Sequence, residues 1–222
     1  MKNNILELSK KLISVPSLKG DISNLKKVLE IARLELSEYQ CKVFESDGVP
    51  SVLYYNTKSI PKKFTLILDA HLDVVPGNPK QYLPKVVGNK LFGRGAYDMK
   101  AAAAAEILLF KELAGKVNYP LGLQLVTDEE VGGFNGAKYQ AKEGINTECM
   151  IAGECSSDFT LSTKAKGVVW MEIEFQGITA HAAYPWEGKN AVFEMNQFLS
   201  KLWKLYPIPK NKVWKTTINV SI

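Results

Sequence analysis

The sequence of 222 residues predicts an α/β fold, in which a largely parallel sheet is flanked by helices and followed by the first part of a smaller α+β domain. Short apolar segments such as residues 64–70 are typical of strands that are buried on both faces. Segments with helical spacing alternate with these strands, as they do in parallel sheets. After residue 167 the pattern changes to alternating polar and apolar residues, which indicates a second, different piece of structure.

The individual elements follow from the same patterns. Apolar residues that recur every three or four positions, or an alanine-rich run, predict helices at residues 3–14, 21–38, 99–113, 136–142 and 190–205. Short apolar or alternating runs predict strands at residues 41–45, 51–55, 64–70, 121–127, 149–152, 168–175 and 216–222, with a small hairpin at 84–92. We place a boundary at residues 164–167, which gives a first domain over residues 1–165 and a partial second domain over residues 166–222.

Composition excludes several classes of protein. The net charge of +5 comes from scattered lysines and only two arginines, so no basic patch for nucleic acid is expected. The longest apolar run, residues 101–110, is interrupted by Glu106, and the first residues form an amphipathic pattern rather than a signal peptide. We therefore expect no membrane segment. The three cysteines include no C-x-x-C pair, which makes a disulfide framework unexpected and favours the cytoplasm.

Acidic residues and a histidine follow the predicted strands at the points where these strands end. His71 follows the strand at 64–70, Glu129 and Glu130 follow the strand at 121–127, and Glu154 follows the strand at 149–152. Asp98 stands just before the helix at 99–113. Because ligands bind beyond the carboxyl ends of strands in open α/β sheets, these side chains should gather along one edge.

A divalent cation would remove the repulsion within such a cluster. Each piece taken alone has an ordinary explanation, since a His-x-Asp is usually a paired histidine and two glutamates after a strand usually begin a helix. The repetition at one strand end after another favours a metal site. One imidazole with several carboxylates suits Zn²⁺, with Co²⁺ or Mn²⁺ as substitutes.

The motifs that contain these residues resemble one family of metal-dependent hydrolases. The segments are 68–76 (LDAHLDVVP), 93–100 (GRGAYDMK), 127–133 (TDEEVGG), 153–154 (GE) and 179–185 (TAHAAYP), the last followed by Gly188, Asn190 and Ala191. They resemble the acetylornithine deacetylase, succinyl-diaminopimelate desuccinylase and aminoacylase-carboxypeptidase family of zinc metallopeptidases. The resemblance covers essentially the whole chain, and it indicates the family but not the substrate.

The resemblance implies a role for each matching residue. His71 and Glu154 would bind a first metal, Asp98 would bridge two metals ahead of a cis peptide to Met99, and Glu130 would bind the second metal. Asp73 would orient His71 by a hydrogen bond. Glu129 would be the general base that takes a proton from the attacking water. His181 would belong to the lid domain and, in a homodimer formed through that domain, would support the oxyanion in the partner's site.

The sequence departs from this family pattern in its length. In the family the chain returns from the lid and supplies a further metal-binding histidine, whereas this sequence stops within the lid and has two histidines. The sequence is therefore compatible with one bound Zn²⁺ ion or with two. The function implied is hydrolysis of an amide bond in an N-acyl amino acid or small peptide. The alternative is a truncated, noncatalytic remnant that binds a metal or dimerises without turnover.

Overall fold

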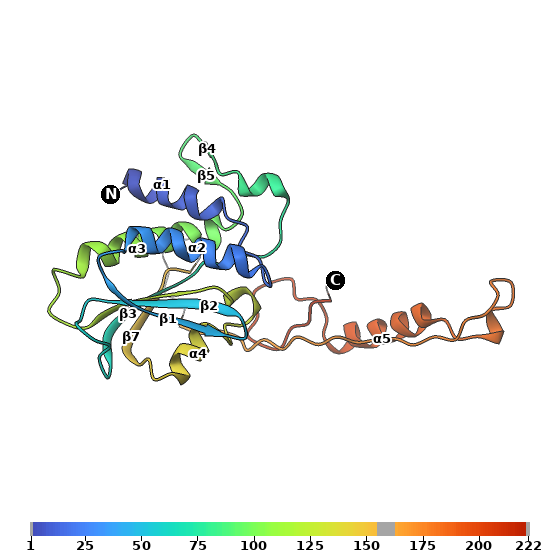
Figure 1. Ribbon diagram of the computed structural model, residues 1–222. Coiled ribbons are helices and arrows are strands. Elements are labelled where there is room, and N and C mark those ends of the chain that lie inside the picture. The colour runs from blue at the N-terminus through green and yellow to red at the C-terminus, as the bar shows by residue number, and fades with distance from the viewer. Residues whose placement is uncertain (1, 155–162, 221–222) are drawn as a thin grey trace. The chain divides into compact units, whose positions relative to one another are not determined.

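A computed structural model describes residues 2–154 and 163–220 of the chain (Figure 1). The chain divides into two units, Met1–Phe159 and Thr160–Ile222. The first unit contains a five-stranded sheet and the helices that pack on it. The second unit contains one long helix and extended segments. The assignment of a catalytic domain to residues 1–165 and a lid domain to residues 166–222 stays a prediction.

The sheet of the first unit has the strand order β1-β2-β6-β3-β7. The central strand β3 (Phe64–His71) runs parallel to both β6 (Leu121–Val126) and β7 (Thr147–Ala152). A hairpin of β1 (Gln40–Ser46) and β2 (Val49–Tyr55) adds antiparallel strands beside β6. The predicted α/β fold is confirmed, and the carboxyl ends of the three parallel strands lie at one edge of the sheet.

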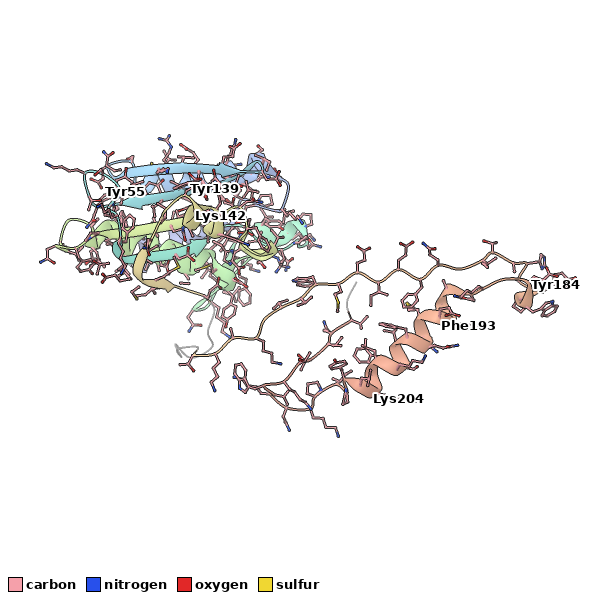
Figure 2. All side chains as sticks on the ribbon, turned by 90° about the horizontal axis from the view of Figure 1, so that it is seen from below. Tyr55, Tyr139, Lys142, Tyr184, Phe193 and Lys204 are labelled. Atoms are coloured by element: carbon pink, nitrogen blue, oxygen red, sulfur yellow. The ribbon has the colours of Figure 1, made fainter. Side chains whose placement is uncertain are left out.

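Helices cover both faces of this sheet (Figure 1). On one face lie α1 (Lys2–Ile13), α2 (Ile22–Glu35) and α3 (Ala101–Leu113), which enclose the main apolar core with the sheet. The short helix α4 (Ala137–Lys142) lies on the other face, where Tyr139 packs against a smaller cluster that includes Tyr55 (Figure 2). The outer hairpin of β4 (Lys85–Val87) and β5 (Lys90–Phe92) forms where the sequence predicts it.

The strand β7 differs from the prediction in its burial. Its apolar sequence predicts a strand in the core, but among the described strands β7 is the outermost, with β3 as its neighbour. Met150 and Ile151 are therefore about half exposed, at 46% and 49%. Apolar composition predicted the strand correctly, but it does not determine the position of a strand within the sheet.

Within residues 163–220, the strands that the alternating pattern predicts do not form. Residues 168–175 and 216–220 have no regular secondary structure, and positions 221–222 of the second predicted strand lie outside the described residues. A strand is stable only when a neighbour satisfies its backbone groups, so alternation alone was not sufficient. The predicted helix is confirmed as α5 (Ala191–Leu205), on which Phe193 and Lys204 are exposed (Figure 2).

Within residues 2–154 and 163–220, none of the helices has both the length and the apolar character needed to cross a bilayer.

Phe110 provides a test of the packing between α3 and the sheet. Its ring is fully buried and meets Tyr39 edge to face, with ring centroids 5.2 Å apart. We expect Phe110→Ala to lower the free energy of unfolding by about 3–5 kcal/mol because it leaves a cavity in the core. Phe92→Ala, which removes a half-exposed ring, should change it by less than about 0.5 kcal/mol. Urea denaturation measures both, and equal losses would contradict this packing.

Candidate metal centre

Three side chains that the sequence predicts as metal ligands lie together at the carboxyl edge of the sheet. His71 ends β3, Glu154 follows β7, and Asp98 lies in the turn Ala96–Lys100 that leads into α3. One potential ligand atom from each lies within 4.8 Å of the others. His71 Nε2 is 2.9 Å from Asp98 Oδ1 and 3.6 Å from Glu154 Oε1. The expected cis peptide between Asp98 and Met99 is also present.

The orientation of the His71 ring is set by Asp73. His71 Nδ1 lies 3.1 Å from the backbone carbonyl oxygen of Asp73 and 3.4 Å from its carboxylate. Because both groups are acceptors, Nδ1 must carry the proton when the ring is neutral, and Nε2 then has a free lone pair. That lone pair faces Asp98 and Glu154, which is the tautomer that a metal ligand needs.

Asp73 also connects the end of β3 to the residues that follow β6. Its two carboxylate oxygens accept the backbone N–H groups of Glu129 and Glu130, at 3.2 and 3.0 Å. The Asp73 side chain is almost completely buried. One residue therefore fixes both the imidazole and the backbone that carries the two glutamates, which is a larger part than the sequence predicts for it.

The two adjacent glutamates lie in different places. The Glu129 carboxylate is 3.9 Å from His71 Nε2, beside the three-ligand cluster, and its side chain is half exposed. Glu130 is not in that cluster, although Asp98 is close enough to influence its pKa. Burial and the neighbouring acid Asp98 raise the pKa of Glu130. Of the two adjacent glutamates, Glu129 thus has its carboxylate beside the three-ligand cluster, whereas Glu130 lies outside that cluster.

The cluster has the electrostatics of a cation site. Burial lowers the pKa of the His71 imidazole, but Asp73, Asp98 and Glu154 outweigh burial and raise it to about 10. Burial raises the pKa of Glu129, against the opposing effect of His71 and with a further contribution from Glu154. A proton on His71 thus compensates the acids, and a divalent ion would compensate them better. One imidazole nitrogen and carboxylate oxygens form a donor set that suits zinc.

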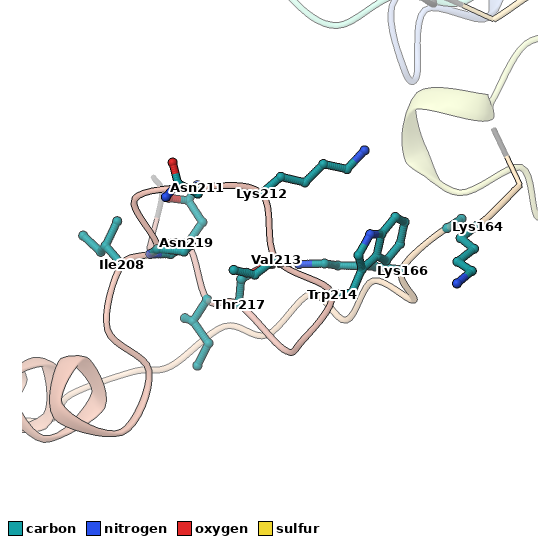
Figure 3. A pocket seen from close by; sticks show the side chains of 12 residues that line it. Lys164, Lys166, Ile208, Asn211, Lys212, Val213, Trp214, Thr217 and Asn219 are labelled. Carbon is teal, nitrogen blue, oxygen red and sulfur yellow. Dashed lines mark hydrogen bonds between the residues drawn. The ribbon is translucent and has the colours of Figure 1, made fainter. Parts of the chain in front are cut away.

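The remaining candidate, His181, lies in the second unit. Its Nδ1 accepts the backbone N–H of Ala183 at 3.1 Å, and its ring lies 5.4 Å from the ring of Tyr184. Its role therefore stays a prediction. A cavity of about 570 Å³ also lies in this unit, lined by Lys166, Trp214 and others (Figure 3). It contains none of the predicted site residues, so it is not the candidate centre.

Several buried polar residues near the centre were not singled out from the sequence. Ser17 and Lys100 are completely buried, and Glu106 nearly so. Burial, with Asp69 nearby, raises the pKa of Glu106 to about 8. A charged residue within an apolar run, as Glu106 is, was the available signal. Ser17 carries no such signal because a serine in a loop is ordinary.

The fold is that of metallopeptidase catalytic domains. A tripeptidase from Staphylococcus aureus superposes with a TM-score of 0.57 at 19% identity, over 90% of this chain and 56% of that chain. An M20 family metallo-carboxypeptidase from Sulfolobus solfataricus superposes with a TM-score of 0.55 at 20% identity, over 67% of this chain and 37% of that chain. At this level of identity the likeness establishes the fold alone.

Sequence comparison identifies the family. Residues 67–210 match the model of peptidase family M20/M25/M40, and the chain belongs to this family. A probable carboxypeptidase of Paracoccidioides brasiliensis (strain Pb03) is 34% identical over 70% of this chain and 39% of its own length. A succinyl-diaminopimelate desuccinylase of Stenotrophomonas maltophilia (strain K279a) is 28% identical over 89% of this chain and 56% of its own length. The chain thus spans about half, or less, of these relatives.

Because His71 is protonated in the absence of metal, the affinity for zinc should depend on pH. A zinc ion must displace this proton, so below pH 10 the affinity should rise by up to about tenfold per pH unit. In Asp73→Asn the loss of negative charge should lower the pKa of His71, and the rise should level off at a lower pH. Competition with a chromophoric chelator measures the dissociation constant at each pH.

Glu148 supplies the matched control for this measurement. Its carboxylate is exposed and pairs with Lys63 at 3.5 Å, so Glu148→Gln removes the same charge outside the cluster. The pH dependence of Glu148→Gln should equal that of the wild type. An affinity that does not change with pH in the wild type would contradict the protonated His71.

Proposed function

We propose that this chain carries the metal centre of a hydrolase that cleaves an amide bond in an N-acyl amino acid or small peptide. The observation that supports this most is the cluster of His71, Asp98 and Glu154 at the carboxyl edge of the sheet, with the Glu129 carboxylate beside it. Family membership supports the same class of reaction. The relatives named above are a probable carboxypeptidase and a succinyl-diaminopimelate desuccinylase, and both names denote hydrolysis of this class of bond.

His71, Asp98 and Glu154 would hold a zinc ion, and Asp98 with Glu130 could hold a second one. Such an ion, when bound, polarises an amide carbonyl and makes a water molecule more acidic. The donors of the first ion already lie within 4.8 Å of one another. With the ion bound, Asp73 would accept the remaining proton of the His71 ring from Nδ1 and so direct the lone pair of Nε2 at the ion.

Glu129 is the residue that we assign to proton transfer. It lies close to the cluster without belonging to it, so its carboxylate is free to accept a proton from the attacking water. Burial raises its pKa toward the working range of a general base, and the same carboxyl can return the proton to the leaving amine. His181 is the proposed donor of a hydrogen bond to the carbonyl oxygen as negative charge develops there.

A second candidate is metal binding without turnover. The side chains of Asp98 and Glu154 are 46% and 43% exposed, so water reaches the cluster freely. Electrostatic stabilisation of a reaction is strongest in sites that exclude water. Zinc retained by the chain with no hydrolysis of any N-acyl amino acid or dipeptide would support this second candidate.

We further propose that the protein works in the cytoplasm as a homodimer formed through residues 166–222. The exposed free thiols of Cys41 and Cys149 suit a reducing compartment. Sedimentation equilibrium should give twice the mass of the chain, and deletion of residues 166–222 should give a monomer. A monomeric full chain would contradict the dimer and the cross-subunit role of His181.

Substitution of Glu129 tests the mechanism. We expect Glu129→Gln to retain zinc and to lower kcat by about 10²–10⁴-fold, because the proton acceptor is lost while the ligands remain. Elemental analysis after dialysis measures zinc, and release of free amino acid from N-acyl amino acids and dipeptides measures hydrolysis.

Glu143→Gln is the control, since it removes an exposed carboxylate from the same unit, and its activity should match the wild type. Unchanged hydrolysis in Glu129→Gln would refute the assigned role. Loss of zinc in Glu129→Gln would instead make Glu129 a ligand.

A further inference from the structure

Two of the completely buried polar side chains outside the ligand set contribute to the hydrogen bonds of the loop between α1 and α2. They are Ser17, within this loop, and Lys100, at the start of α3. Burial of such groups is unfavourable unless each is hydrogen-bonded, so their partners reveal what the fold requires of them. We refer to residues 14–18 as the brace loop.

The brace loop is hydrogen-bonded to the segment that carries His71. The Ser17 hydroxyl donates to the carbonyl of Leu72 at 2.6 Å, and the Ser17 carbonyl accepts the N–H of Val74 at 3.0 Å. These two bonds lie on either side of Asp73 and directly follow His71. The loop thus fixes the backbone from which both the imidazole and its partner Asp73 project.

The brace loop is also bonded to the turn that carries Asp98. Lys100 Nζ donates to the carbonyls of Leu12 and Val15, at 2.9 and 2.7 Å, at the end of α1 and the start of the loop. Lys100 lies two residues after Asp98, and its own N–H donates to Gly95 at 2.8 Å, which closes the turn. The position of Asp98 therefore depends on contacts made by the amino-terminal residues of the chain.

Gly95 shows how closely the two ligand segments approach each other. Its φ is +78°, and a Cβ there would lie 2.7 Å from the Val74 side chain and 3.2 Å from Lys100 Cδ. A side chain at this position would push apart the segment held by Ser17 and the turn held by Lys100. The two segments, residues 71–74 and 95–100, are separated in the sequence by the β4–β5 hairpin, so their close contact is not a consequence of being neighbours in the chain.

We propose that the brace loop sets the distance between His71 and Asp98 and so prepares the metal centre, with Ser17 and Lys100 as positioning residues. This inference rests on the proposed function, because it takes His71 and Asp98 as ligands. Neither Ser17 nor Lys100 touches the ion or the substrate in this proposal. Both act through the backbone that presents the ligands, as outer partners do in metal sites.

Ser17→Ala and Lys100→Met test the proposal in the full chain, with zinc and Co²⁺ as probes. Each variant should raise the zinc dissociation constant by about tenfold or more, as loss of an outer partner does. The visible absorption of the Co²⁺-loaded protein should shift, because the ligand geometry changes. Without metal, hydrogen exchange should be faster at residues 71–75 in Ser17→Ala and at residues 96–100 in Lys100→Met.

Ser9→Ala is the matched control. Ser9 is also buried, and its hydroxyl donates to the carbonyl of Ile5 at 2.7 Å, but this bond lies within α1 and touches neither ligand segment. Ser9→Ala should keep the wild-type zinc affinity and Co²⁺ spectrum. If Ser17→Ala behaves like Ser9→Ala in all three measurements, the brace is refuted.

The remaining outcomes separate the brace from the metal site. If Lys100→Met does not fold, Ser17→Ala alone decides. If the wild type binds no zinc, the proposed function fails. The role of the brace loop is then tested by the rate of hydrogen exchange at residues 71–75, compared between Ser17→Ala and Ser9→Ala. Faster exchange in Ser17→Ala would mean that the brace loop holds this segment in place. Equal exchange in the two variants would overturn the proposal.

Discussion

The arrangement at the sheet edge depends on one buried imidazole surrounded by carboxylates. His71 is almost inaccessible to solvent, yet its ring faces Asp73 on one side and Asp98, Glu129 and Glu154 on the other. A buried imidazole would ordinarily be neutral. Here the surrounding carboxylates stabilise its charged form and raise its pKa. The parallel strands β3, β6 and β7 bring these groups to one edge of the sheet. The topology of the sheet is therefore what allows the opposite charges to compensate each other.

The sequence was sufficient to predict this convergence. An apolar strand followed by a chemically reactive side chain, found at 64–71 and again at 149–154, predicts the same sheet edge because parallel strands share a direction. It was not sufficient for the second unit, where alternation at 168–175 predicted a strand that has no partner among the described residues. Strand pairing depends on residues far away in sequence, which periodicity does not contain. Ser17 and Lys100 were missed for the same reason, since their partners are 55 and 85–88 residues away.

Family membership and the structure support one another at different levels. The family model extends over residues 67–210 and so includes both units, whereas the three-ligand cluster lies wholly in the first. The first unit has its own apolar core, formed by helices on both faces of the sheet. The chain spans 39% and 56% of the two named relatives, which carry additional sequence beyond the aligned part. The three residues that we propose for the first ion all lie in the part of the family pattern that this chain contains.

The position of β7 at the edge of the sheet has a consequence for how the protein opens. Edge strands with one neighbour and exposed side chains are usually among the first elements to separate in native-state fluctuations, well before global unfolding. Glu154 directly follows β7, whereas His71 ends the central strand. Separation of β7 would remove one ligand and leave the others in place. An ion held by all three ligands would bind only when β7 is in place, and so it would oppose this fluctuation by mass action. Metal binding and the attachment of β7 to the sheet would then each stabilise the other.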